Sequence, residues 1–245
     1  MEPPSSSTSR PLNLSTSSLT AIIVAGGSSR RMGFDKTFAL LGDRPIVAHA
    51  IAAFEATGSV EHIIVVGRVD RVAELHELIA RQQFKKVRDV LPGGIRRQDS
   101  VGEGLRSMPP TDYVAVHDAA RPLVLPSQIE QVFAAARTHG AAALAAPVTD
   151  TLKRADAEGI VSGSVDRNGL YAMQTPQIFS RDLLLAACAQ IAQEKLSITD
   201  EVSAIERLGQ NVALVTNNAP NFKITLPGDL TLAELVLKLR VSPDR

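Results

Sequence analysis

Glycines and basic side chains follow a short apolar run near the start of the chain. The run 21–25, AIIVA, is typical of a strand buried on both faces of a parallel sheet, and Gly26 and Gly27 follow it at once. Glycines at the end of such a strand let a ligand approach the main chain, whose N–H groups can bind an anion. Arg31 and Lys36 come next and supply donors for a polyphosphate. The pattern predicts a triphosphate-binding loop.

The spacing of these residues excludes two common phosphate-binding loops. A Walker loop requires GxxxxGK[ST], and a dinucleotide fold requires GxGxxG at the start of a helix. The stretch AGGSSRRMGFDK contains neither pattern. For this stretch alone, a glycine-rich turn with solvated arginines stays open as the alternative.

Two more groups of polar residues follow strand-like runs. In VHDAARP, Asp118 either holds Mg²⁺ together with phosphate oxygens or caps a turn, and His117 is expected to be a hydrogen-bonded structural residue. The proline after Arg121 keeps the chain extended, which makes Arg121 a candidate for binding a substrate phosphate. In LPGGIRRQDSV, Gly94 and Ser100 offer a flexible backbone and a hydroxyl suited to reading the edge of a base.

Apolar strand-like runs alternate with segments of helical periodicity along most of the chain. This order predicts an α/β fold with a doubly wound, mostly parallel sheet and helices on both faces. Ligands of such sheets bind beyond the carboxyl ends of the strands, so the three polar groups should meet at one edge. Strands are expected at 62–66, 86–90, 113–116, 141–146, 212–215 and 222–225, and helices at 45–54, 71–81, 97–106, 127–138, 181–194, 199–208 and 227–239.

Residues 148–170 interrupt this alternation inside an expected single domain of residues 20–240. The sequence TLKRADAEGIVSGSVD is typical of two short strands joined by a polar turn, with too little apolar area to fold alone. It is either a protruding β-arm that clasps a partner or a hairpin lying on the surface of its own domain.

Composition excludes several classes of protein. The formal net charge is zero, aromatic residues make up 4%, and tryptophan is absent, which argues against nucleic-acid binding. No apolar stretch reaches the ~18 residues of a membrane span. Cys188 is the only cysteine, which excludes an intrachain disulfide and a cysteine-based zinc site. Residues 1–19 are rich in Ser, Thr and Pro and lack a secretory apolar region, so we expect a disordered leader on a cytoplasmic protein.

Seven motifs occur in an order that resembles one enzyme family. They are AGGSSRRMG, GGIRRQDSV, HDAARP, APVTDTLKR, VDRNGLYAMQTPQIF, ITDE and NFKIT, and they cover roughly residues 20–240. Together they resemble the 2-C-methyl-D-erythritol 4-phosphate cytidylyltransferases, which are nucleotidyltransferases. The resemblance implies transfer of a cytidylyl group from CTP to 2-C-methyl-D-erythritol 4-phosphate, in the non-mevalonate route to isoprenoid precursors.

The resemblance also implies a role for each matching residue. Arg31, Lys36 and Lys223 would be catalytic, with Lys36 and Lys223 at the α-phosphate, and Asp118 would hold Mg²⁺. Nucleotide binding would fall to Ala25, Gly26, Gly27, Ser29, Gly94, Ser100 and Ala119, and acceptor binding to Arg121, Thr151, Arg167, Thr175 and Thr199. In this family the arm comes from a neighbouring subunit, so Thr151 and Arg167 would complete the partner's site in a homodimer.

Three rival functions stay open at this point. A cytidylyltransferase for another polyol phosphate, such as ribitol 5-phosphate, would differ in the VDRNGL and TPQ segments. A non-catalytic nucleotide-binding domain would be expected to lack Lys36 or Asp118, and both are present. A dinucleotide-dependent oxidoreductase is disfavoured by the missing glycine fingerprint.

Overall fold

A computed structural model describes residues 17–27 and 35–241 of the chain. The site residues Ser29 and Arg31 lie outside these ranges, and so do residues 1–16 of the predicted leader. No helix in the described ranges combines the length and the apolar character that crossing a membrane requires.

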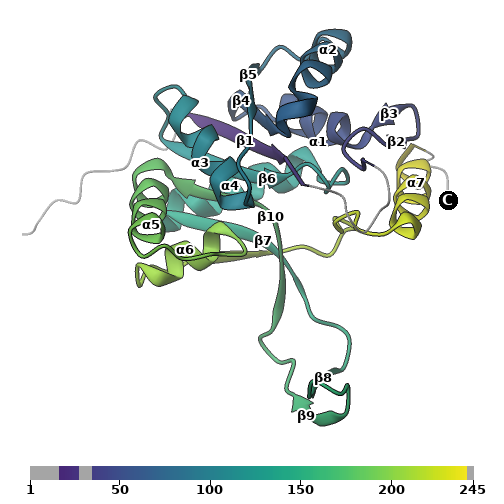
Figure 1. Ribbon diagram of the computed structural model, residues 1–245, viewed down its shortest axis with the longest axis vertical. Coiled ribbons are helices and arrows are strands. Elements are labelled where there is room, and N and C mark those ends of the chain that lie inside the picture. Colours follow the sequence, from purple (N-terminus) through teal and green to yellow (C-terminus); the bar gives the residue numbers. More distant parts are fainter. Residues whose placement is uncertain (1–16, 28–34, 242–245) are drawn as a thin grey trace, which may run out of the picture.

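A seven-stranded sheet forms the centre of the molecule (Figure 1). Only β10 runs antiparallel to its neighbours, so the prediction of a mostly parallel sheet is confirmed. The strand order is β11-β7-β10-β6-β1-β4-β5, with β1 at Leu19–Ala25, β4 at Val60–Gly67, β5 at Val87–Pro92, β6 at Tyr113–Asp118, β7 at Ala141–Pro147, β10 at Tyr171–Ser180 and β11 at Ala213–Thr216.

Helices cover both faces of this sheet. Alternate residues of β1 face opposite layers, because Ala21 and Ile23 belong to one buried cluster and Ile22 to another. The first cluster packs against α1 (Ile46–Glu55), α2 (Val72–Gln82) and α4 (Pro126–His139); the second packs against α3 (Arg97–Ser107), α5 (Arg181–Gln193) and α6 (Glu201–Arg207).

A third, smaller cluster packs an early segment of the chain against a late one. The two-stranded sheet of β2 (Leu40–Leu41) and β3 (Arg44–Pro45) packs against α7 (Pro227–Val241), and the two lie together in Figure 1. Leu41, Ile46, Ile224 and Ala233 are all fully buried there. This packing brings the segment before α7 next to the segment that follows the first glycine loop.

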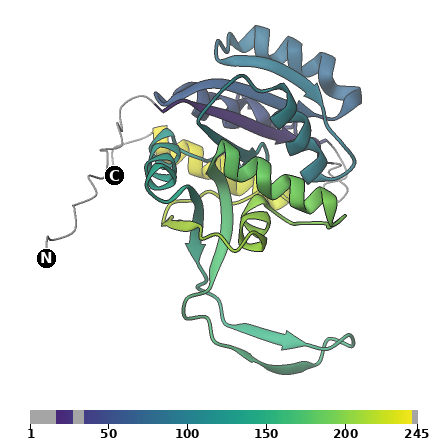
Figure 2. The ribbon, with the colours of Figure 1, turned by 90° about the vertical axis from the view of Figure 1, so that its left-hand side faces the viewer.

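The segment between β7 and β10 projects from the body as a hairpin in both views (Figures 1 and 2). Its strands are β8 (Leu152–Ala155) and β9 (Val161–Val165), which pair antiparallel. The hairpin therefore does not lie on the surface of its own domain.

The structure differs from the sequence-based prediction at three segments. The short sheet of β2 and β3 was not predicted. The ten-residue strand β10 was not predicted, since its polar Gln174, Thr175 and Gln177 and its proline conceal the apolar pattern of a strand. The strand predicted at 222–225 is wrong: the segment is not part of a sheet. Its alternating pattern arises because Ile224 and Phe222 pack against the small cluster beneath α7.

Candidate active site

The two glycine-containing loops lie side by side at the carboxyl ends of β1, β4 and β5. The N–H of Gly93 donates to the carbonyl of Gly67 at 2.6 Å, and the N–H of Gly94 donates to the hydroxyl of Ser100 at 3.2 Å. A Cβ at Gly93 would approach Ser100 Oγ to 2.6 Å, and one at Gly26 would lie 3.5 Å from the same atom. A side chain at position 93 would therefore collide with the buried Ser100 hydroxyl and crowd the carbonyl of Gly67 at 3.2 Å, which favours glycine there.

A cavity of about 100 Å³ opens where the first glycine loop meets the segment before α7. Lys36 and Lys223, which come from opposite ends of the described chain, both line it. Lys36 Nζ donates to the carbonyl of Ile224 at 3.2 Å, so the two lysine-bearing segments are in direct contact. The cavity is also lined by the predicted site residues Ala25, Gly27, Asp118 and Ala119.

Asp118 lies at the floor of this cavity between two cations. Its Oδ2 accepts a hydrogen bond from Lys223 Nζ at 2.7 Å, and its Oδ1 accepts one from Arg97 Nε at 2.8 Å. Burial opposes ionisation of this carboxyl, but the charges of Arg97 and Lys223 outweigh burial and hold the pKa of Asp118 well below its usual range. Asp118 is therefore a fixed negative charge at neutral pH.

Behind Arg97 lies a second buried carboxylate, that of Glu201. Arg97 Nη1 donates to Oε1 and Oε2 of Glu201 at 2.7 and 2.8 Å, and Glu201 is only 1% exposed. Burial raises the pKa of Glu201, and the charge of Arg97 opposes that effect. Arg97 thus links two buried carboxylates and holds Asp118 in place.

A second cavity, of about 220 Å³, adjoins the first and shares Asp118 and Lys223 with it. Predicted acceptor-binding residues line this cavity: Arg121, Thr175 and Thr199. Arg97 Nη2 and Arg121 Nε are buried and have no hydrogen-bond partner among the described residues. Guanidinium nitrogens of this kind are suited to an anionic ligand, because buried donors without an acceptor are costly.

His117 and Thr175 form a hydrogen-bonded chain next to Asp118. His117 Nε2 lies 3.2 Å from the carbonyl of Arg121 and Nδ1 lies 3.0 Å from Thr175 Oγ1, which accepts a bond from the N–H of Asp118 at 3.1 Å. These partners fit a neutral ring with the proton on Nε2. Burial lowers the pKa of His117 to about 4, which keeps the ring neutral. As expected from the sequence, His117 has a structural role.

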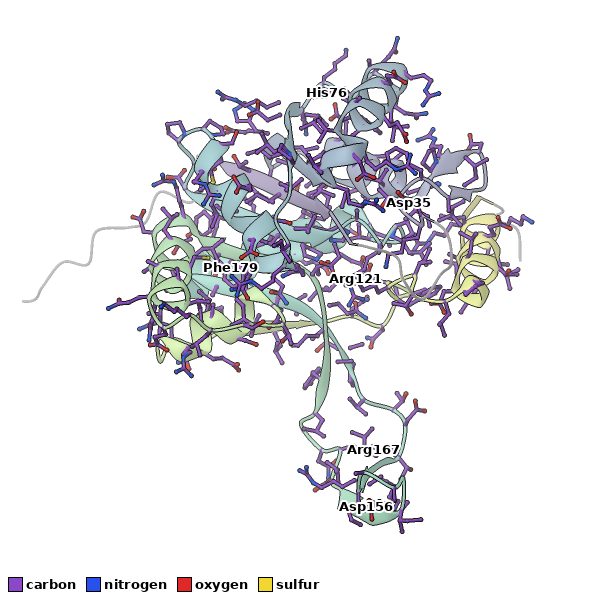
Figure 3. The ribbon with its side chains drawn as sticks, in the orientation of Figure 1. Asp35, His76, Arg121, Asp156, Arg167 and Phe179 are labelled. Carbon is purple, nitrogen blue, oxygen red and sulfur yellow. The ribbon has the colours of Figure 1, made fainter. Side chains whose placement is uncertain are left out.

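Two predicted site residues lie far from both cavities. Figure 3 shows Arg167 on the projecting hairpin and Arg121 in the body. Arg167 Nη1 donates to the carbonyl of Thr149, and Thr151 is exposed at the base of the hairpin. Neither residue lines a cavity near Asp118 within its own chain.

Sequence reasoning did not assign the pairing of Arg97 with Asp118 or the presence of Glu201 behind it. Arg97 is one of several charged residues in the stretch IRRQD, and Glu201 lies where the sequence predicts the start of a helix, so neither residue stands out. The only signal was their occurrence in the GGIRRQDSV and ITDE motifs. Their contact joins residues 104 positions apart, which no local pattern reveals.

Comparison with known proteins identifies the family. The family model for 2-C-methyl-D-erythritol 4-phosphate cytidylyltransferase matches residues 19–239. Relatives with that name from Pelotomaculum thermopropionicum and Desulforamulus reducens are 40% and 41% identical, over 90% and 91% of this chain and 94% and 97% of theirs.

Solved structures agree with these sequence relatives. A 4-diphosphocytidyl-2C-methyl-D-erythritol synthase from Anaerococcus prevotii superposes with a TM-score of 0.81 at 25% identity, over 91% of this chain and 96% of its own. A 2-C-methyl-D-erythritol 4-phosphate cytidylyltransferase from Thermus thermophilus gives 0.74 at 31% identity, over 89% and 98%. The chain therefore belongs to the 2-C-methyl-D-erythritol 4-phosphate cytidylyltransferase family of nucleotidyltransferases.

Proposed function

We propose that this enzyme transfers the cytidylyl group of CTP to 2-C-methyl-D-erythritol 4-phosphate, giving 4-diphosphocytidyl-2-C-methyl-D-erythritol and pyrophosphate. The observation that carries the proposal is the pair of adjoining cavities with Asp118 and Lys223 at their junction. A triphosphate in the cavity with Lys36 and an acceptor phosphate in the cavity with Arg121 would meet at that junction. This is the arrangement that a direct transfer between two bound phosphates requires.

The reaction is an in-line displacement at the α-phosphorus of CTP. An oxygen of the acceptor phosphate forms the new P–O bond, and the bond to the β-phosphate breaks, so pyrophosphate leaves with the electron pair. The acceptor phosphate is already ionised near neutral pH, so no general base is required. Lys36 and Lys223 stabilise the charge on the α-phosphoryl oxygens by preorganised electrostatics. Arg31, outside the described residues, is proposed to act on the same phosphates.

Mg²⁺ is proposed to bind at Asp118 together with the nucleotide. The described residues contain no group of three or more His, Cys, Asp or Glu that could hold a metal alone. Mg²⁺ at nucleotide sites commonly uses one or two carboxylates and the phosphates of the substrate. Asp118, ionised and lining the cavity, fits that mode. A bound Mg²⁺ would neutralise phosphate charge there.

Recognition of the base is assigned to the second glycine pair. Ser100 is 2% exposed, and its hydroxyl accepts a hydrogen bond from Gly94. Ser100 therefore acts on cytosine through the loop that it holds, while main-chain groups around Gly94 read the base.

The acceptor site is proposed to be completed by a second subunit. Arg121, Thr175 and Thr199 line the acceptor cavity, and Thr151 and Arg167 lie on the hairpin instead. A homodimer in which each hairpin reaches the neighbouring body would bring Thr151 and Arg167 to the partner's acceptor. The projection of the hairpin from its own body supports this arrangement.

The test is an assay of pyrophosphate release with matched substrates. We expect turnover with CTP and 2-C-methyl-D-erythritol 4-phosphate, and much slower turnover with UTP, ATP or GTP. Faster release with ribitol 5-phosphate would establish the rival cytidylyltransferase. CTP binding without release from any polyol phosphate would instead establish a non-catalytic nucleotide-binding domain.

A further inference from the structure

The residue before Lys36 is a largely buried carboxylate tied to a different part of the chain. Asp35, labelled in Figure 3, has a side chain only 12% exposed, and its Oδ1 accepts a hydrogen bond from the N–H of Thr37 at 3.0 Å. Its Oδ2 lies 3.1 Å from Arg71 Nε and 3.9 Å from Arg68 Nη1. No described donor makes a well-aligned hydrogen bond to Oδ2, so its charge is balanced by these arginines, chiefly Arg71.

Arg71 contacts the lysine segment at a second point. It ends the 3₁₀ turn η1 (Val69–Arg71), which follows β4, and its Nη1 pairs with Glu74. Its guanidinium carbon lies 5.4 Å from the centre of the Phe38 ring, within the range of a cation–π contact. Arg71 therefore touches the residues at both ends of the short segment 35–38.

The opposite side of this segment is anchored to the sheet and to α1. Thr37 is 7% exposed, and its hydroxyl donates to the carbonyl of Ala25 at 3.5 Å. The carbonyl of Thr37 accepts a bond from the N–H of Val47 at 3.2 Å. The backbone at Lys36 is thus fixed by Thr37 on one side and by the Asp35–Arg71 pair on the other.

We infer that Arg71, acting through Asp35, is a positioning residue that aims Lys36 into the nucleotide cavity. The inference rests on the proposed function. The two anchors come from different elements: the ion pair comes from the turn after β4, and the bonds of Thr37 come from β1 and α1. Removing the ion pair leaves the Thr37 anchor in place and allows the start of the segment to move. Because Lys36 acts on charge that develops during transfer, the change should fall mainly on kcat.

The experiment compares Asp35→Asn and Arg71→Gln with a matched control. Asp35→Asn preserves size and the acceptor for the N–H of Thr37. Arg106→Gln removes an arginine from an exposed i,i+3 pair with Glu103 on α3 and is the control. A displacement of 1 Å can cost about 10²-fold, and with Thr37 intact we expect each site variant to lose about tenfold in kcat. KM for CTP should rise by a smaller factor, about threefold.

A coupling measurement separates positioning from a general structural role. Lys36→Met combined with Arg71→Gln should be no slower than Lys36→Met alone, to within about twofold, because Arg71 acts through Lys36. A further tenfold loss in the double variant, or parent-like kcat in Asp35→Asn and Arg71→Gln, would overturn the inference. Melting temperatures should place all variants in the folded state.

A failure of the proposed function can be distinguished from a failure of this inference. If the proposed function is wrong, the parent itself would release no pyrophosphate. Calorimetric titration with CTP then tests the pair: Arg71→Gln should weaken CTP binding about threefold relative to the parent and Arg106→Gln should not. Equal affinities for all three proteins would overturn the inference independently of turnover.

Discussion

Lys223→Met separates catalysis from stability more sharply than other changes at the site. Lys223 Nζ lies 2.7 Å from Asp118 Oδ2, and its side chain lines both cavities. The backbone around it is held independently: the N–H of Ile224 donates to the carbonyl of Ala120 at 2.8 Å, and Asn221 is 1% exposed. The substitution therefore removes the ammonium group and leaves the segment in place.

The expected effects on rate and on folding differ widely. Loss of one preorganised donor to a developing oxyanion costs about 10²–10³ in kcat, or about 2.7–4 kcal/mol. The pair with Asp118 adds less to folding, because the Lys223 side chain is 37% exposed and Arg97 still pairs with the carboxylate. A partly solvated pair contributes about 1 kcal/mol or less, which for a domain of this size corresponds to a fall in Tm of about 2–4 °C.

The assay is steady-state pyrophosphate release together with a thermal melt of each variant. Lys85→Met, an exposed lysine after α2, is the control and should match the parent in both measurements. Lys36→Met should lose turnover in the same range as Lys223→Met, since both lysines line the nucleotide cavity. Turnover of Lys223→Met within a few-fold of the parent would refute the role at the α-phosphate.

Three further predictions follow from the charges of the site and from the hairpin. Arg97→Gln leaves two buried carboxylates without their shared cation and should lower the free energy of unfolding by about 3–5 kcal/mol in urea titrations, part of which Glu201→Gln should restore. The pKa of His117 is lowered from 6.5 to about 4, so protonation of the unfolded chain should reduce stability as pH falls from 6.5 to 4; His117→Gln should flatten that part of the profile. Mixing inactive Lys36→Met and Arg167→Gln proteins should restore about one quarter of the parent activity after subunit exchange, since half the dimers are mixed and hold one intact site; no recovery would exclude shared sites.

The order of strands and helices could be predicted because its signals are local. The runs that become β1 and β4 are apolar and β-branched, and both strands are almost entirely buried. The helix predicted at 45–54 is observed as Ile46–Glu55, where Pro45 fixes the entry into the first turn. In these elements the tertiary packing agrees with the local preference of the residues for strand or helix, so the sequence was sufficient to predict them.

The strand β10 could not be predicted because its burial depends on distant partners. Gln177 is 1% exposed, and its side chain bonds to Asp200 and to the N–H groups of Glu201 and Val202. Thr175, 4% exposed, bonds to residues of β6. Polar side chains whose partners lie mostly on other elements are stable in a core, yet in the sequence such residues are typical of a loop.

The site could be predicted only in part from the sequence. The part that could not be predicted, the contacts between distant charged residues, explains the local charge of the site. The motifs placed cations and a carboxylate at three strand ends, but a chain with zero net charge provides no global attraction for anionic substrates. The fold creates a local excess instead: four basic side chains and two carboxylates line the two cavities, namely Lys36, Arg97, Arg121 and Lys223 with Asp118 and Asp200. Asp118 fixes the positions of two of these cations. The same carboxylate that would bind a metal therefore also arranges the positive charge that two phosphates must meet.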